Sequence, residues 1–378
     1  MHVAGGIYLE TCETPSWSGL WGSGLRAAIA ISEMSEKVTL HGYLKNNGEN
    51  LTSRLASYRV STEILPRHHD VVFSYFHPLS DPLVEPAHQR IRKQRALLLS
   101  ADNILRFSYL EGSACVHGSH VVYDPQSPRG PEKFHENGST AENLALVMNE
   151  NEFKAYSASD DLDEGASRLL KANEAQVIVV KRGIFGANVY QTSETPFYVP
   201  AYQSERIFKI GTGDVFSAAF SYFWAEKRQD ANQAADLASR AVASYCENPT
   251  VPINSMGLRD RKPIQECRAS LIEVYGSADT LGRLYTRQEA LYCIRSLGLE
   301  ASIGSGTLAA AGKRVGTVSL VIVDGFPDQC LTVLDTTLPG IIFLDEEHRL
   351  KPAFTHHEQI TDDFTSSIYK ACMQSPVL

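Results

Sequence analysis

The sequence predicts an α/β protein with two domains, and three observations carry this prediction. Short apolar runs typical of strands alternate with longer runs typical of helices. Residues 175–181 (AQVIVVK) are almost continuously apolar, which is typical of a parallel strand covered on both faces. The pattern breaks at Asn248-Pro249-Thr250-Val251-Pro252 and starts again after residue 268, which indicates a second, smaller domain.

Composition limits the classes of protein. With 378 residues, 43% hydrophobic and 21% charged, the chain has the length and composition of a two-domain globular protein. Its net charge of −9 argues against nucleic-acid and anionic-membrane partners, because both require clustered Lys and Arg. Seven scattered cysteines without a Cys-x-x-Cys pair favour reduced thiols and a cytoplasmic setting. We expect neither a signal peptide nor a membrane span.

The first predicted elements bring polar side chains to the ends of strands and helices. Residues 7–10 are expected to close a strand that carries Glu10 at its end, where ligands gather in open α/β sheets. Gly22-Ser23-Gly24 then opens a packed helix with Arg26 in its first turn. Arg26 offers a guanidinium fork suited to a carboxylate or phosphate. The alternatives are a solvated loop carboxylate for Glu10 and a surface arginine for Arg26.

Further strands and helices follow in alternation. The sequence predicts strands at 38–44, 58–64, 70–76, 101–107 and 120–126, a hairpin at 181–190 and a helix at 231–245. This order favours a mostly parallel sheet with its ligand site at the strand ends.

The stretch 209–220 (KIGTGDVFSAAF) carries the strongest functional signal. Two glycines flank Thr212, and a long apolar run then predicts a buried helix that starts at Asp214. Free N–H groups and the positive end of the helix dipole would meet at this loop, so it predicts an anion site. Asp214 could take a proton from a hydroxyl beside a phosphate. The alternative is a tight turn in which Asp214 is a helix cap.

Gly211-Thr212-Gly213-Asp214 and the following helix of small and aromatic residues resemble the Gly-Ala-Gly-Asp signature of the ribokinase-like (PfkB) carbohydrate and nucleoside kinases. The resemblance covers roughly residues 1–255 and implies a three-layer ribokinase-like domain with a small β lid. It also implies ATP-dependent phosphorylation of a hydroxyl on a sugar or nucleoside. Asp214 would be the catalytic base, and Gly211, Thr212 and Gly213 would form the anion hole.

The same resemblance assigns roles to weaker matches. Asn149 and Glu152 correspond to the family's Asn-x-x-Glu, which supports Mg²⁺ and phosphate, and oxygen ligands of this kind suit Mg²⁺. Glu10, Gly24 and Arg26 fall where the family binds its substrate. The strands between residues 38 and 76 fall where the family has its lid. Because such lids often pair, the resemblance leaves a homo-oligomer open.

We expect residues 256–268 to be a linker and 269–378 to form a small Rossmann-like α/β domain. This domain faintly resembles nucleoside 2-deoxyribosyltransferases, with Tyr275 and Asp324 as matching positions. The nucleophilic glutamate of that family has no counterpart after Asp324, so a glycosyl intermediate would need Asp328 instead. A binding or assembly role is therefore favoured for this domain.

These observations predict a kinase for a small sugar or nucleoside. Two alternatives remain open. One is a catalytically silent protein that senses a nucleotide or sugar with a kinase-like pocket, which the altered lead-in at Lys209-Ile210 and the presence of Arg26 favour. The other is an N-glycosidase that acts through the C-terminal domain.

Overall fold

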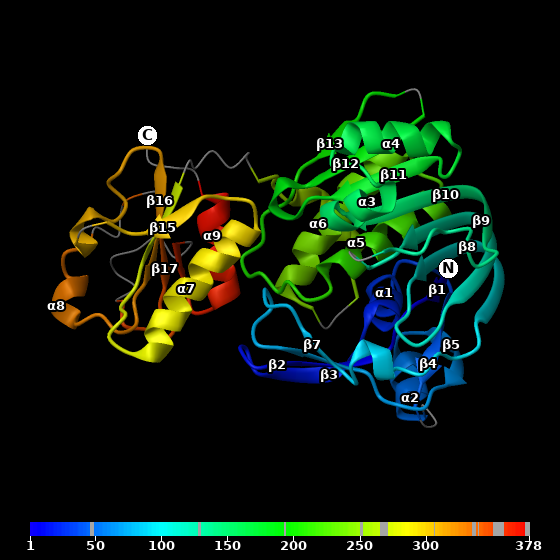
Figure 1. Cartoon of the computed structure of the whole chain (residues 1–378), viewed down its shortest axis with the longest axis horizontal. Coiled ribbons are helices and arrows are strands. Elements are labelled where there is room, and N and C mark those ends of the chain that lie inside the picture. Colours follow the sequence, from blue (N-terminus) through cyan, green and yellow to red (C-terminus); the bar gives the residue numbers. More distant parts are fainter. Residues whose placement is uncertain are drawn as a thin grey trace. The chain divides into compact units, whose positions relative to one another are not determined.

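The computed structural model describes residues 1–45, 49–127, 130–192, 194–249, 252–264, 271–305, 307–334, 338, 340–350 and 359–374. The chain forms two compact units (Figure 1). Unit 1 comprises Met1–Ser204 and Lys209–Pro263, and unit 2 comprises Glu205–Phe208 and Ile264–Leu378. Each unit has its own sheet and helices, so the predicted α/β fold class with a second, smaller α/β part is confirmed.

The main sheet of unit 1 has nine strands within the described ranges, in the order β13-β12-β11-β10-β9-β8-β1-β4-β5. All neighbours are parallel except β11–β12 and β12–β13. The strands are β1 (His2–Ala4), β4 (Val38–Leu44), β5 (Val60–Pro66), β8 (Leu97–Phe107), β9 (Ala114–Asp124), β10 (Thr140–Asn149), β11 (Val177–Lys181), β12 (Ala187–Gln191) and β13 (Phe197–Val199). Asp124, Asn149 and Lys181 are the last residues of β9, β10 and β11. Because these strands are parallel, the three residues lie at the same, carboxyl end of the sheet.

Helices cover both faces of this sheet (Figure 1). Helices α3 and α4 pack in one core cluster with alternate residues of β10 and β11, and the intervening residues of these strands are equally buried. The helices of unit 1 are α1 (Ser23–Ala30), α2 (Glu49–Ser57), α3 (Glu150–Ser157), α4 (Leu162–Lys171), α5 (Thr212–Ser221), which continues as a π-helical turn (Tyr222–Glu226), and α6 (Ala231–Glu247). Short 3-10 helices occur at His88–Arg90, Gly183–Phe185 and Ser255–Asp260.

A separate small sheet has the order β3-β2-β6-β7 and contains β2 (Tyr8–Cys12), β3 (Trp17–Trp21), β6 (Val72–Tyr75) and β7 (Leu83–Glu85). It confirms a small β layer, and of the three strands expected in it, the one at residues 70–76 forms β6 of this sheet. Residues 38–44 and 58–64 belong to the main sheet, where all seven residues of β4 are buried. Residues 7–10 were expected to close a strand at a sheet edge, yet Glu10 lies inside β2 of the small sheet. The main sheet begins instead with the three-residue β1.

Unit 2 has a parallel sheet whose described strands follow the order β15-β14-β16-β17-β18. Its elements are β14 (Leu271–Tyr275), α7 (Leu281–Ser296), β15 (Ala301–Ile303), a 3-10 helix (Leu308–Ala310), β16 (Thr317–Ile322), α8 (Asp328–Leu331), β17 (Ile341–Leu344), β18 (Ile360–Thr361) and α9 (Phe364–Met373). Glu205–Phe208 also belongs to this unit, where Ile207 N donates to Ser366 Oγ (2.9 Å). Part of the predicted linker, residues 265–268, lies outside the described residues. Every helix in the described ranges is too short or too polar to cross a bilayer.

Candidate active site

The predicted anion loop leads into α5, as expected, but the helix begins two residues earlier than Asp214. Gly211 is the N-cap residue with φ +79°, a conformation that residues with a side chain rarely adopt. A Cβ on Gly211 would also lie 2.1 Å from Arg26 Nε. Glycine is therefore required at position 211 for two reasons, its backbone conformation and the close approach of Arg26.

The start of α5 presents free backbone donors. The amides of Gly213 and Asp214 have no acceptor among the described residues, whereas Thr212 N donates to Lys209 O (3.2 Å). Unpaired amides in the first turn of a helix are a suitable site for an anion. The amides that the structure leaves available are thus those of Gly213 and Asp214, while the amide of Thr212 is already in use.

Both carboxylate oxygens of Asp214 accept hydrogen bonds. Oδ2 accepts from Arg26 Nη1 (2.8 Å), and Oδ1 accepts from Gln126 Nε2 (2.6 Å). The Asp214 side chain is 11% exposed. Burial raises the pKa of Asp214, and the charge of Arg26 partly opposes that effect. A carboxylate with a raised pKa is a better proton acceptor than a free aspartate.

Arg26 connects two other predicted site residues, Glu10 and Asp214. Its guanidinium forms a two-pronged pair with Glu10, through Nη2 to Oε2 and through Nη1 to Oε1 (3.2 Å), and it donates from Nε to Tyr245 Oη (2.9 Å). Arg26 is 3% exposed and Glu10 is 4% exposed. The predicted fork for a substrate anion is therefore occupied by Glu10 and Asp214, so Arg26 holds the Asp214 carboxylate in place.

Gly24 has a packing role in this structure. A Cβ at this position would lie 2.5 Å from the carbonyl carbon of Gly5, and Gly24 N donates to Gly6 O (3.0 Å). The small residue lets α1 approach the end of β1 closely. Gly24 thus contributes to the site by placing Arg26, which lies two residues further along the same helix.

A pocket of about 290 Å³ adjoins the start of α5. Its walls come from the carboxyl ends of β9, β10 and β11, from the first turn of α5 and from α6. Phe216 and Val242 supply apolar surface, and Gly213 brings free backbone into the wall. Asp214 is not part of this wall, whereas Gln126 is. The Gln126 amide therefore reaches from the pocket wall to the Asp214 carboxylate.

Two lysines lie in this pocket. Lys181 Nζ contacts Asp124 Oδ2 (2.6 Å) and lies 3.6 Å from the position of a Cβ on Gly213. Lys209 Nζ donates to Thr212 Oγ1 (2.8 Å). Burial lowers the pKa of Lys209, and the nearby charge of Lys181 acts in the same direction. Positive charge is therefore concentrated beside the free amides of α5.

Asn149 and Glu152 also line the pocket, and they form a capping box at the start of α3. Asn149 Oδ1 accepts from Glu152 N (2.9 Å), and Glu152 Oε2 accepts from Asn149 N (2.8 Å). The Asn-x-x-Glu spacing thus has a structural reason as well. Burial and the neighbouring charge of Asp124 raise the pKa of Glu152 to about 7.

The oxygen ligands in this part of the pocket suit a magnesium ion. Asp124 Oδ1 is buried and has no hydrogen-bond partner among the described residues. Glu152 and Asn149 offer further oxygens, and Mg²⁺ prefers oxygen ligands supplemented by water. An unpartnered buried carboxylate oxygen costs free energy unless a cation or water meets it. Asp124, Glu152 and Asn149 therefore fit the predicted cation.

In unit 2 the three candidate residues have separate partners. Tyr275 Oη donates to Glu273 Oε2 (3.1 Å), and Asp324 accepts from the backbone amides of Glu346 (3.0 Å) and Glu347 (3.4 Å). The Asp328 side chain is 92% exposed. No hydrogen bond joins Tyr275 to either aspartate in the part of the chain that the structure describes. The structure therefore does not bring these candidates together.

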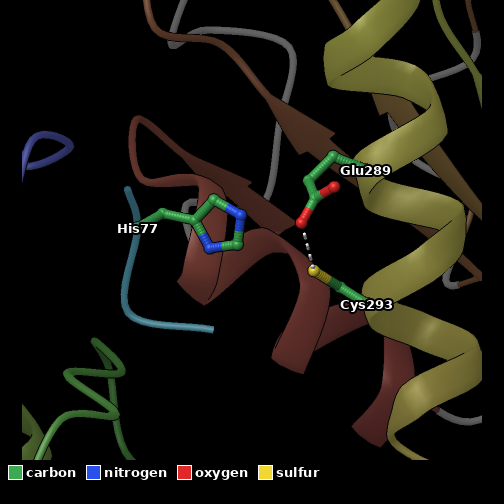
Figure 2. Close-up of side chains that lie close together, drawn as sticks. All are labelled: His77, Glu289 and Cys293. Atoms are coloured by element: carbon green, nitrogen blue, oxygen red, sulfur yellow. Dashed lines mark hydrogen bonds between the residues drawn. The ribbon is translucent and has the colours of Figure 1, made fainter. Parts of the chain in front are cut away.

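Helix α7 carries a buried cysteine with an acidic neighbour. Cys293 Sγ donates to Glu289 Oε1 one turn earlier (3.7 Å; Figure 2). Burial, followed by the charge of Glu289, raises the pKa of Cys293 to about 12. Cys293 is therefore a thiol at neutral pH. Figure 2 also labels His77 of unit 1, whose Nδ1 accepts from Leu79 N (3.2 Å).

Besides the two lysines, the contributors Asp124, Gln126 and Tyr245 were not among the predicted site residues. Asp124 had a signal, because it ends an apolar strand and precedes Pro125. Gln126 follows that proline with φ +49°, and nothing in its local sequence indicates that its amide meets Asp214. Tyr245 lies on α6 and donates to Ile210 O (2.8 Å) while accepting from Arg26. Its role depends on packing between distant segments.

The fold and this pocket define an α/β protein with a pocket beside free amides at a helix N-terminus. Residues 115–250 match the family model described as pfkB family carbohydrate kinase. The predicted resemblance to the ribokinase-like (PfkB) family is thereby confirmed over these residues. No curated protein matches the chain.

Solved structures with a similar fold include kinases. A ribokinase from Thermotoga maritima is 14% identical, with 68% of this chain and 97% of that chain covered and a TM-score of 0.49. A pyrophosphate-dependent kinase in the ribokinase family, complexed with a pyrophosphate analog and myo-inositol, is 15% identical, with 69% and 100% covered and a TM-score of 0.48. Phosphofructokinase-2 from Escherichia coli is 16% identical, with 69% and 97% covered and a TM-score of 0.46.

Proposed function

We propose that unit 1 is an ATP-dependent kinase that phosphorylates a hydroxyl group of a sugar or nucleoside. The observation that carries this proposal is the position of Asp214. Its carboxylate and the free amides of Gly213 and Asp214 lie together at the start of α5, beside a pocket that contains two lysines. The match of residues 115–250 to a carbohydrate kinase family supports the same reaction class.

In the proposed reaction the protein supplies a base and a fixed set of donors. Asp214 accepts the proton of the acceptor hydroxyl as the oxygen attacks the terminal phosphate of ATP. The free amides of Gly213 and Asp214 face the charge that develops on the transferred group. Arg26 holds one carboxylate oxygen, which orients Asp214 and keeps it ionised.

ATP and Mg²⁺ fit the rest of the pocket. The free amides of α5, Lys181 and Lys209 would face the phosphates, and Phe216 and Val242 would offer apolar surface to the adenine ring. Asp124, Glu152 and Asn149 would hold Mg²⁺. The ion would neutralise phosphate charge when bound.

The decisive test is Asp214→Asn, which keeps the shape of the side chain and removes its basicity. We expect turnover to fall by a factor of about 10² to 10⁴, as for the loss of a general base. The measurement is ADP release in a coupled assay over a panel of sugars and nucleosides. Asp102→Asn, a change at an exposed acid of the same unit, is the matched control. Equal rates for Asp214→Asn and wild type would end the proposal.

A second candidate is a catalytically silent sensor of a nucleotide or sugar. One observation favours it: both carboxylate oxygens of Asp214 already accept hydrogen bonds, from Arg26 and Gln126. A sensor would bind a nucleotide or sugar in calorimetry and transfer no phosphate to any member of the panel. Measured transfer that depends on Asp214 would exclude it.

For unit 2 we propose a binding or assembly role. Its fully exposed candidate, Asp328, pairs with Arg349, and Asp324 accepts backbone amides of the loop after β17. A covalent glycosyl intermediate requires a carboxylate positioned in a pocket. The N-glycosidase alternative has no such observation in its favour, and release of free base from nucleosides would be needed to revive it.

A further inference from the structure

The two lysines of the pocket differ in how their charges are balanced. Lys181 contacts the carboxylate of Asp124 at 2.6 Å and also donates to Ser217 Oγ (3.4 Å). Lys209 has no carboxylate within salt-bridge distance among the described residues, and its ammonium donates to the hydroxyl of Thr212. A partly buried ammonium that faces a hydroxyl instead of a carboxylate keeps an unbalanced charge. Lys209 therefore lacks the counter-charge that Lys181 has.

The surroundings of Lys209 indicate what would balance this charge. Thr212, its hydrogen-bond partner, is the first residue of α5, and the next two amides along the chain are the free ones. Lys209, Thr212 and Gly213 line the same pocket. Burial lowers the pKa of Lys209, and an anion at this position would oppose that effect while accepting hydrogen bonds from the amides. The two free amides and the Lys209 ammonium are all hydrogen-bond donors.

We propose that Lys209 binds the phosphate chain of the donor and makes the pocket selective for polyphosphates. A phosphate at the start of α5 would replace Thr212 Oγ1 as the acceptor of the Lys209 ammonium. This inference rests on the proposed function in placing the donor in this pocket. It goes beyond that function because it proposes that Lys209, which precedes the Gly-Thr-Gly-Asp motif, contributes much of the binding affinity for the donor. The same chemistry would serve a nucleoside triphosphate and an inorganic polyphosphate.

The test measures binding by calorimetry in the presence of MgCl₂, with the whole chain and three probes. The probes are the imido analogue of ATP (AMP-PNP), inorganic tripolyphosphate and adenosine. We expect Lys209→Met to weaken AMP-PNP and tripolyphosphate at least tenfold and to leave adenosine within twofold of wild type, because a charge-assisted hydrogen bond to phosphate is lost. Lys209→Arg should retain most of the affinity, since it keeps the charge.

The controls separate this inference from the proposed function. Lys171→Met, a change at an exposed lysine at the end of α4, should bind all three probes like wild type. Binding of AMP-PNP that is unchanged in Lys209→Met, or an equal loss for adenosine, would overturn the role of Lys209. So would a wild-type protein that binds neither phosphate probe. If the phosphate probes bind and weaken as expected while no acceptor is phosphorylated, Lys209 keeps its role and the kinase proposal fails.

Tripolyphosphate and adenosine also identify the donor. A donor that is a nucleoside triphosphate predicts measurable adenosine binding and tighter binding of AMP-PNP than of tripolyphosphate. An inorganic polyphosphate donor predicts the reverse order. With either donor, the inference requires that Lys209→Met binds AMP-PNP and tripolyphosphate at least tenfold more weakly than wild type does.

Discussion

Replacing Arg26 by methionine should destabilise unit 1 through two uncompensated carboxylates. Arg26 is 3% exposed and forms ion pairs with both Glu10 and Asp214. At 2.8 Å and an effective dielectric constant of about 20, the attraction to Asp214 alone is about 6 kcal/mol. Desolvation of the charges offsets part of this attraction. We therefore expect Arg26→Met to lower the free energy of unfolding by about 3–5 kcal/mol at pH 8, as for other broken buried pairs.

The loss should depend on pH. Burial already raises the pKa of Asp214, and removal of Arg26 should raise it further, because the arginine is the main group that lowers it. With a folded pKa above the unfolded value, the folded variant takes up a proton as the pH falls. The destabilisation is then full above the raised pKa and shrinks below it. Wild type and Arg26→Met should differ less at pH 5 than at pH 8.

The assay is urea unfolding followed by tryptophan fluorescence. All three tryptophans of the chain lie in unit 1, so the signal reports this unit alone. Arg54→Met is the matched control, because Arg54 stacks on Trp21 at 4.5 Å, donates to Leu20 O and pairs with no carboxylate of the described residues. Adding Glu10→Gln to Arg26→Met should recover about 1–3 kcal/mol. Equal losses at pH 5 and pH 8, or no recovery in the double variant, would refute the electrostatic explanation.

Two further predictions concern pH. Because the pKa of Glu152 is raised to about 7, affinity for Mg²⁺, measured by calorimetry in the presence of AMP-PNP, should rise about tenfold from pH 6 to pH 8, and Glu152→Gln should abolish this dependence. Burial lowers the pKa of His41 to about 4, so the unfolded state binds more protons as the pH falls below 6.5. The free energy of unfolding should therefore fall by about 2 kcal/mol from pH 7.5 to pH 5 through this group. In His41→Asn this fall of about 2 kcal/mol between pH 7.5 and pH 5 should be absent. A free energy of unfolding that depends on pH as in wild type would contradict the assignment to His41.

The parts of the fold that follow from local patterns were predictable. The apolar run at 175–181 forms β11, and the hairpin that follows forms β12 as expected. The glycine-threonine-glycine loop leads into a buried helix. In each case the residues that determine the element are adjacent in sequence, so periodicity and turn chemistry are sufficient.

Strand membership was harder to predict, because it depends on distant pairing. β1 has only three residues, which is too short for the alternation of apolar and polar residues in a strand to be recognised. The stronger pattern at residues 7–10 was therefore assigned to the first sheet strand, whereas these residues pair with Trp17–Trp21 and Val72–Tyr75 in the small sheet. β4 was expected in the lid, but it lies between β1 and the edge strand β5 in the main sheet and is buried on both faces.

The candidate site was predictable as a set of residues and not as a network. Glu10, Arg26 and Asp214 were each named for separate reasons, and the structure joins them although Arg26 and Asp214 are 188 positions apart. Such contacts depend on α1 packing against α5, which no local pattern reports. The unbalanced charge of Lys209 could not be predicted for the same reason. That Lys209 has no carboxylate partner among the described residues is a property of the folded pocket.

The hydrogen bonds to Asp214 also bear on the choice between kinase and sensor. An ionised carboxylate has about four acceptor positions, and the described contacts of Asp214 use two of them. Arg26 is a permanent cation tied to Glu10 and Tyr245, so it cannot leave without exposing a buried acid. Gln126 is neutral and borders the pocket, so an acceptor hydroxyl can bond beside it or replace it at little electrostatic cost. Arg26 therefore holds Asp214 in place, and the hydrogen bond from Gln126 is the one that an alcohol would share or replace in the proposed kinase.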